Sequence, residues 1–328
     1  MENQLITDIE HEMLAHLNNH QMEQLHKVLV HYLHGVTATQ QALDLNEKSN
    51  ESLLVSFLSA KRVEGCSSKS LRYYESTLNN MLFALNKPIK HITTDDLRQY
   101  LDKYQQKNGA SKATIDNIRR ILSSFFTWLE EENIIMKSPV RRIHKVKTKT
   151  TVKDTYTDES LEIMRDNCGS IRDLAIIDIL ASTGMRVGEL VRLNRADIDF
   201  INRECIVFGK GDKERKVYFD ARTKLHLNNY LNTRTDENPA LFVSLQKPNN
   251  RLQISGVEIR LRQLGRKLQI PRVHPHKFRR TLATMAIDKG MPIEQVQHLL
   301  GHCNVDTTLQ YAMVNQNNVK NSHRKFIA

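Results

Sequence analysis

The sequence predicts a mainly α protein with a small antiparallel β-sheet in its C-terminal half. Apolar residues recur at helical spacing through most of residues 3–140. Short runs of β-type residues then flank a glycine-containing turn at residues 209–213, and helical spacing returns after about residue 255. With 328 residues, 40% of them hydrophobic, the chain is long enough for two domains that each bury a core.

Residues 1–48 are an acidic, helical N-terminal extension. Apolar residues at helical spacing predict a helical hairpin over residues 3–35, interrupted at Asn18 and Asn19. The extension holds two Lys/Arg and seven Asp/Glu. Because this charge repels DNA, we expect the extension to contact an accessory protein instead.

The sequence of residues 49–140 predicts a domain of four helices. The expected helices start at residues that cap helices well: Asn50 for a helix through Lys61, Ser67 and Ser68 for one to about Leu85, Thr93 for one to Gln106, and Ser111 for one to about Asn133. The last helix carries Phe125, Phe126 and Trp128, which we expect in the core and not as platforms for stacking bases. Pro139 is expected to end the domain.

Residues 141–153 predict a basic linker. They hold six Lys/Arg, no acid and no helical period. Such a stretch is typical of a solvated interdomain linker, and in a DNA-binding protein it can also follow the phosphates. Residues 49–153 together hold 19 basic and ten acidic residues, and residues 154–328 hold 27 and 20. Outside the extension, the charge therefore favours a polyanionic partner such as nucleic acid.

The sequence of residues 154–328 predicts a second domain that contains both helices and strands. The predicted elements are helices at 158–167 and 170–182, a short helix after Arg186, strands near 199–202, 204–208 and 215–219, and helices at 257–268, 275–289, 292–300 and around Tyr311.

Several classes of protein are disfavoured. No run of about 18 apolar residues is present, so no membrane span is expected. The acidic start does not resemble a secretory signal. The four cysteines are scattered without Cys-x-x-Cys spacing, which favours reduced thiols in the cytoplasm over a zinc site or disulfides.

Five residues in the second domain suggest phosphodiester chemistry without a metal. Arg186 follows Thr183-Gly184-Met185, His276 and Arg279 form a His-x-x-Arg pair, and Tyr311 stands nine residues after His302. Arginines clamp a phosphate bidentately, histidines handle protons and oxyanion charge, and a phenol can attack phosphorus. His276 and Arg279 share one helix face near a helix start, where anions are favoured.

These motifs, in this order, resemble the tyrosine site-specific DNA recombinases (phage integrase family), and the two-domain Xer-type members in particular. The resemblance covers residues from about 49 to 315. It implies a helical, SAM-like core-binding domain at 49–140, which binds DNA, and a catalytic domain at 154–328. It places the catalytic residues at Arg186, Lys210, His276, Arg279, His302 and Tyr311. One departure is Arg280, where many relatives have a second histidine; helix phase with His276 favours Arg279 as the residue that enters the site.

The resemblance also implies a mechanism. Tyr311 attacks the scissile phosphate and forms a 3′-phosphotyrosyl bond, with Lys210 as the acid for the leaving 5′-oxygen. Arg186 and Arg279 neutralise the transition state, His276 is a general acid/base, and His302 binds a non-bridging oxygen. The implied partners are double-stranded DNA with paired short recombination sites and three further copies of the chain in a tetramer on synapsed DNA. No cofactor, metal or ATP is implied.

Two alternatives use related features. A type IB topoisomerase has similar chemistry but relaxes DNA, and a silent DNA-binding regulator could keep the fold without catalysis. The separate four-helix domain favours a recombinase over the topoisomerase, and chemically competent residues at all six positions disfavour the silent regulator. Neither the target sequence nor the outcome (integration, excision, inversion or dimer resolution) follows from the sequence.

Overall fold

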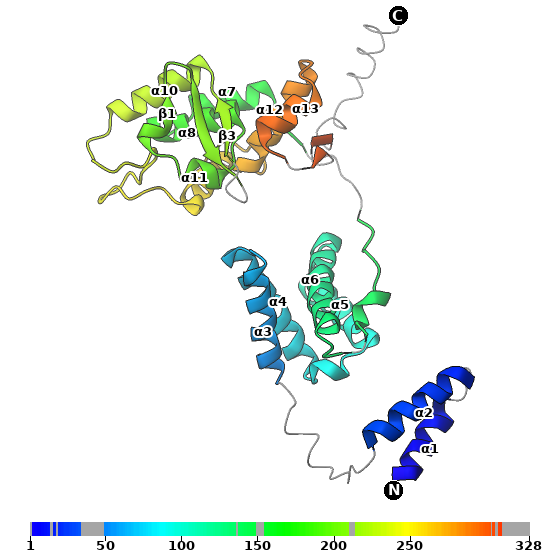
Figure 1. The fold of residues 1–328 in the computed structure, drawn as a ribbon. Helices are drawn as coiled ribbons and strands as arrows, with labels where there is room; N and C mark the ends of the chain where they lie inside the picture. Colours follow the sequence, from blue (N-terminus) through cyan, green and yellow to red (C-terminus); the bar gives the residue numbers. More distant parts are fainter. Residues whose placement is uncertain are drawn as a thin grey trace, which may run out of the picture. The chain divides into compact units, whose positions relative to one another are not determined.

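The computed structural model describes residues 2–13, 16–17, 19–33, 49–135, 137–148, 154–209, 214–302, 304–305 and 308–309. The chain divides into an N-terminal unit, residues 1–149, and a C-terminal unit, residues 150–328 (Figure 1). Within the described residues the regular structure is mostly helical, and the strands form a three-stranded antiparallel sheet. The predicted fold class is therefore confirmed. The helices of these residues include none that is long and apolar enough to cross a membrane.

The predicted helical hairpin is present at the start of the chain. Helices α1 (Glu2–Met13) and α2 (Asn19–Leu33) pack against each other (Figure 1). His26 Nδ1 lies 2.6 Å from Glu10 Oε1 between the two helices. Ile6 is buried, whereas Tyr32 is exposed, so part of the apolar surface of the hairpin faces solvent. Residues 34–48 lie outside the described residues.

Four longer helices form the main body of the N-terminal unit: α3 (Asn50–Val63), α4 (Ser68–Leu85), α5 (Thr94–Asn108) and α6 (Lys112–Glu131). Two short 3-10 turns, η1 (Ile89–His91) and η2 (Pro139–Arg142), accompany them. The predicted caps Ser67, Thr93 and Ser111 are confirmed, since each side chain accepts a backbone N–H from the first turn.

The cap predicted at Asn50 is wrong. Ser49 is the N-cap of α3, and its hydroxyl accepts the Ser52 N–H at 3.1 Å. The Asn50 amide instead accepts the Ile89 N–H and donates to the Lys87 carbonyl, both at 2.9 Å. Two adjacent residues could cap this helix, and the contact with residues 87–89 decides between them.

Aromatic residues occupy the core of these helices, as predicted. The ring of Phe57 lies 5.1 Å from that of Phe125 and 5.6 Å from that of Trp128. Phe126 is fully buried beside them. Edge-to-face and tilted contacts of this kind add to the stability that burial provides.

The packed part of this unit continues beyond Pro139. Asp116 on α6 accepts the Val146 N–H at 3.1 Å and the Arg119 Nε–H at 2.9 Å. Ile143 packs against the helical core. The first residues of the expected linker are therefore attached to α6, and residues 149–153 lie outside the described residues.

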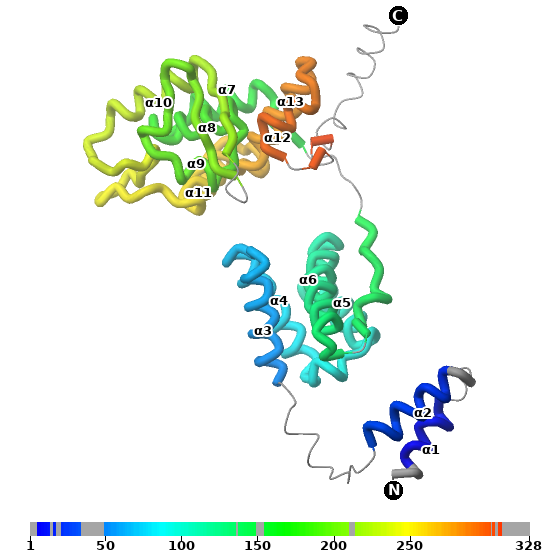
Figure 2. Tube along the Cα trace, viewed as in Figure 1, coloured from blue at the N-terminus to red at the C-terminus, as the bar shows by residue number. Residues whose placement is uncertain are grey.

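The C-terminal unit is built around helix α8. The helices of its described residues are α7 (Asp158–Asp166), α8 (Ile171–Thr183), α9 (Val187–Leu190), α10 (Ala221–Asn232), α11 (Ile254–Lys267), α12 (Pro275–Asp288) and α13 (Ile293–Leu300), with a 3-10 turn η3 (Arg195–Asp197) (Figures 1 and 2). Helix α8 contacts α7, α10, α12 and the sheet. It is buried on several sides, because apolar residues fill most of its positions.

The sheet has the order β1 (Ile198–Asp199), β2 (Glu204–Phe208) and β3 (Glu214–Tyr218), all antiparallel. Cys205 pairs with Val217 and Val207 pairs with Arg215, and the three apolar members of these pairs are buried. Arg215 therefore lies on the inward face of β3, two residues from Val217. Strands β2 and β3 agree with the predicted strands near 204–208 and 215–219, whereas β1 shares only Asp199 with the predicted strand near 199–202.

Helix α10 was not predicted. Its buried residues Thr223, Leu227 and Tyr230 follow helical spacing, but only two of the three are apolar. Asp220 caps it by accepting the Thr223 N–H at 2.8 Å. The helix predicted around Tyr311 lies outside the described residues.

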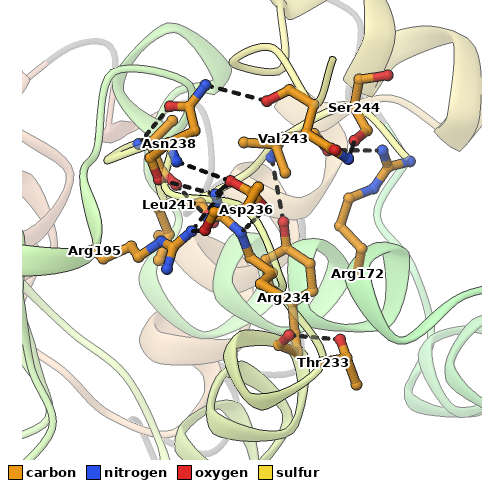
Figure 3. Close-up of polar contacts among 12 residues, drawn as sticks. Arg172, Arg195, Thr233, Arg234, Asp236, Asn238, Leu241, Val243 and Ser244 are labelled. Atoms are coloured by element: carbon orange, nitrogen blue, oxygen red, sulfur yellow. Dashed lines mark hydrogen bonds and ion pairs between the residues drawn. The ribbon is translucent and has the colours of Figure 1, made fainter. Parts of the chain in front are cut away.

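Several arginines of this unit hold an irregular segment after α10 (Figure 3). Arg234 donates to Asp236 at 3.0 Å and to the Asn238 carbonyl at 3.0 Å. Arg195 donates to the Asp236 carbonyl at 2.7 Å, and Arg172 donates to the Val243 carbonyl at 3.0 Å. Hydrogen bonds from Arg234 lower the pKa of Asp236 to about 2. Part of the positive charge of this unit therefore serves the fold.

Candidate active site

Three chain segments meet where helices α8 and α13 end. Helix α8 ends at Gly184 and α13 ends at Gly301, both with left-handed φ angles of 59° and 63°. Glycine adopts this conformation without steric cost and allows the chain to turn sharply. The turns lead directly to Arg186, which precedes α9, and to His302.

Arg279 on α12 connects these two turns. Its guanidinium donates to the Gly184 carbonyl at 2.7 Å and also to the Leu300 carbonyl. The residue is only 3% exposed. The charge of the next residue, Arg280, instead acts on Asp154, Tyr156 and His274. Of the two adjacent arginines, Arg279 is thus the one directed at the segments of Arg186 and His302.

Arg186 is held by two contacts of different kinds. Its Nη1 donates to Glu189 Oε1 at 2.9 Å, and its Nη2 donates to the Gly301 carbonyl at 3.4 Å. Its side chain is 35% exposed. Arg279 and Arg186 therefore bind the consecutive carbonyls of Leu300 and Gly301, which precede His302.

His302 completes this group of three. Its Nδ1 lies 2.9 Å from Thr308 Oγ1, and its backbone carbonyl accepts the Gln297 side-chain amide at 2.9 Å. Burial, followed by the charges of Arg279, Arg186 and Arg215, lowers the pKa of His302 to about 4. The imidazole is therefore neutral at physiological pH.

The structure describes only one of the other three predicted catalytic residues. His276 is exposed on the first turn of α12, three residues before Arg279. Lys210 and Tyr311 lie outside the described residues. The structure thus brings Arg186, Arg279 and His302 together, and it puts His276 on the helix of Arg279.

Two charged residues of this site, Glu189 and Arg215, were not predicted from the sequence. Glu189 is buried beneath Arg186, and Arg215 reaches it from β3 with both terminal nitrogens at 2.7 Å. One signal was present in the sequence: alternation along β3 puts Arg215 on the same inward face as Val217. A charged residue at an inward strand position requires a buried partner.

Comparison with known families assigns both units. A model described as the phage integrase family matches residues 150–318. A second model, described as the N-terminal SAM-like domain of phage integrases, matches residues 53–135. The chain therefore belongs to the phage integrase family.

Relatives and solved structures agree with this assignment. Tyrosine recombinase XerC of Staphylococcus aureus (strain bovine RF122 / ET3-1) is 30% identical over 278 residues, which cover 80% of this chain and 92% of the relative. XerC of Listeria welshimeri is 29% identical over 252 residues, 72% of this chain and 82% of the relative. The fold matches the XerH site-specific recombinase bound to palindromic difH substrate, with a TM-score of 0.67, 20% identity and coverage of 97% and 93%. It also matches a lambda integrase dimer bound to a COC' core site, with a TM-score of 0.68, 18% identity and coverage of 88% and 85%.

The resemblance seen in the sequence is thereby confirmed. The chain is a tyrosine recombinase of the Xer type, an enzyme that cleaves and rejoins DNA in site-specific recombination.

Proposed function

We propose that Tyr311 is the nucleophile and that Arg186, Lys210, His276, Arg279 and His302 assist it in cutting and rejoining DNA. The observation that carries the proposal is the convergence of Arg186, Arg279 and His302 on the end of α13. Two guanidinium groups bind neighbouring carbonyls there, next to an imidazole whose pKa is lowered by burial and then by their charge. Such an arrangement suits a phosphate, which both arginines attract and to which a neutral imidazole donates a hydrogen bond.

The exposure of the two arginines indicates the direction from which DNA approaches. Arg279 is almost fully buried, whereas about a third of the Arg186 side chain is open to solvent. A phosphate would therefore reach Arg186 first, with the charge of Arg279 behind it. Each fixed donor of this kind contributes on the order of 3 kcal/mol to transition-state stabilisation.

Each step of the proposed reaction breaks one phosphoester bond and forms another. The Tyr311 oxygen forms a bond to phosphorus as the 5′-oxygen of the next nucleotide leaves, and His276 accepts the phenolic proton. Lys210 gives a proton to the leaving oxygen, which becomes a free 5′-hydroxyl. The 5′-hydroxyl of a partner strand then attacks the phosphorus of the 3′-phosphotyrosyl bond and gives its proton to Lys210, while His276 returns a proton to the leaving Tyr311 oxygen. No external energy source is required, because one phosphoester replaces another.

The proposed substrate is double-stranded DNA with paired short sites, bound by four copies of this chain in the cytoplasm. The lambda integrase and XerH structures, each bound to DNA, support a DNA partner. The acidic α1–α2 hairpin is proposed to contact an accessory protein, because its charge is opposite to that of the rest of the chain.

Tyr311→Phe tests the nucleophile, with Tyr218→Phe as a matched control. Tyr218 is an exposed tyrosine on β3. On a nicked suicide substrate, we expect the Tyr311 variant to bind the site and form no covalent adduct, while the Tyr218 variant forms it normally. A covalent adduct with Tyr311→Phe would show that another residue attacks. Supercoiled plasmids with and without two sites then separate recombination from relaxation and from silent binding.

A further inference from the structure

A buried carboxylate organises the charges beneath Arg186. The Glu189 side chain, 4% exposed, accepts four hydrogen bonds. Arg215 Nη1 and Nη2 donate to its two oxygens, each at 2.7 Å. The Arg186 side chain donates at 2.9 Å and the Arg186 backbone N–H at 2.7 Å. A carboxylate has about four acceptor positions, so the hydrogen-bonding capacity of Glu189 is filled.

Arg215 also supports the turn that leads to His302. Its Nε donates to the Leu299 carbonyl at 3.3 Å, and its side chain is 10% exposed. A Cβ atom at Gly301 would lie 2.8 Å from Arg215 Cδ, so the aliphatic part of Arg215 passes directly beneath this turn. One side chain therefore contacts both segments that position the phosphate-binding residues.

We propose that Arg215 is a positioning residue that holds Arg186, through their shared partner Glu189, in the geometry for cleavage. This inference rests on the proposed function of Arg186. Arg215 lies on β3, five residues after Lys210 in the sequence. The strand that leaves the segment of Lys210 is thus fastened to the carboxylate that orients Arg186.

The charge balance explains why a second arginine is needed. Glu189 alone would neutralise Arg186 and weaken its attraction for a phosphate. With Arg215 present, one negative charge is shared by two positive charges, and the group keeps a net charge of about +1. The planar, bidentate contact also fixes the direction of the carboxylate, which an ammonium group would not do.

Single-turnover cleavage of a nicked suicide substrate tests the proposal in the full-length protein. The variants are Arg215→Met, Arg215→Lys, Arg186→Ala and the Arg215→Met/Arg186→Ala double variant. The control is Arg222→Met, which removes an arginine that binds Glu162 at 2.7 Å elsewhere in this unit. We expect Arg215→Met to slow cleavage about 100-fold, as for a misplaced reacting group, with half-site affinity within about threefold. The control should cleave at the wild-type rate.

The double variant separates positioning from general support of the fold. If Arg215 acts through Arg186, adding Arg215→Met to Arg186→Ala should slow cleavage less than about threefold further, because interacting residues are not additive. Independent, multiplicative losses would overturn the proposal. If Arg215→Met fails to fold by circular dichroism, Arg215→Lys decides: slow cleavage by a folded protein supports the proposal, and wild-type cleavage overturns it.

Arg186→Ala also separates the proposed role of Arg186 from that of Arg215. Normal cleavage by Arg186→Ala would refute the proposed role of Arg186 itself, and the role of Arg215 with it. Slow cleavage by Arg186→Ala together with a fully active Arg215→Met would refute only the positioning role of Arg215.

Discussion

His302 should make the C-terminal unit sensitive to acid. The imidazole is partly buried and lies within the field of Arg279, Arg186 and Arg215, which lowers its pKa from 6.5 to about 4. As the pH falls below 6.5, the unfolded chain gains a proton at this residue and the folded chain does not. The unfolded state therefore binds more protons between pH 6.5 and 4, so the contribution of His302 to stability is complete above this window and is lost within it.

The size of the effect follows from the shift. Each pKa unit corresponds to about 1.4 kcal/mol, which gives a ceiling of about 3 kcal/mol for the full window. Because the imidazole is only partly buried, solvent screening reduces this value. We expect a loss of about 2 kcal/mol at pH 4.5 relative to pH 7.

Histidine-labelled NMR spectra measure the titration directly, and His302→Asn assigns the signal. In the free protein the signal should shift with a midpoint near pH 4, and a bound duplex carrying the site should raise this midpoint. The free energy of unfolding of the C-terminal unit can be measured by urea unfolding followed by far-ultraviolet circular dichroism. Between pH 7 and 4.5, this free energy should fall by about 2 kcal/mol less in His302→Asn than in the wild type.

A midpoint at pH 6.5 or above in the free protein would refute this reasoning. It would mean that His302 is not buried as described and that the three arginines do not lie close enough to act on its charge. Equal acid sensitivity of the wild type and His302→Asn would show that other groups cause the loss of stability.

Two further predictions concern the stability of the two units. Phe57→Ala should destabilise the N-terminal unit by about 3–4 kcal/mol, because it removes a fully buried ring that contacts Trp128. Trp128 is the only tryptophan of the chain, so its fluorescence reports this transition, and a shift below about 1 kcal/mol would contradict the packing. Gly184→Ala should cost about 2 kcal/mol in the C-terminal unit, since a left-handed φ of 59° and a new Cβ 2.7 Å from Leu282 Cδ2 both oppose it. An unchanged unfolding transition of the C-terminal unit in circular dichroism would contradict this prediction. The fluorescence transition of Trp128 is the control, because it reports the N-terminal unit and should not change.

Local signals in the sequence predicted many of the helices. Ser67, Thr93 and Ser111 cap helices with their own side chains, and Gly301 ends α13, because these contacts reach only three or four residues along the chain. Where two signals compete, as at Ser49 and Asn50, a contact distant in sequence decides. Helix α10 was not predicted because one of its three buried residues, Thr223, is polar and weakens the apolar pattern. Tertiary packing buries Thr223 alongside Leu227 and Tyr230.

The identities of Arg186, Arg279 and His302 as a related set, and the family to which they belong, could be recognised from the sequence by itself. Their arrangement could not. Arg215 meets Glu189 across 26 residues, a pairing that depends on strand register and on the packing of α9 against the sheet. The charge of an arginine also looks the same in a sequence whether it faces DNA or, like Arg234, holds a loop. Residue type determines which chemistry is possible, and only tertiary packing determines which charges share a partner, because burial and distance set the energy of each pair.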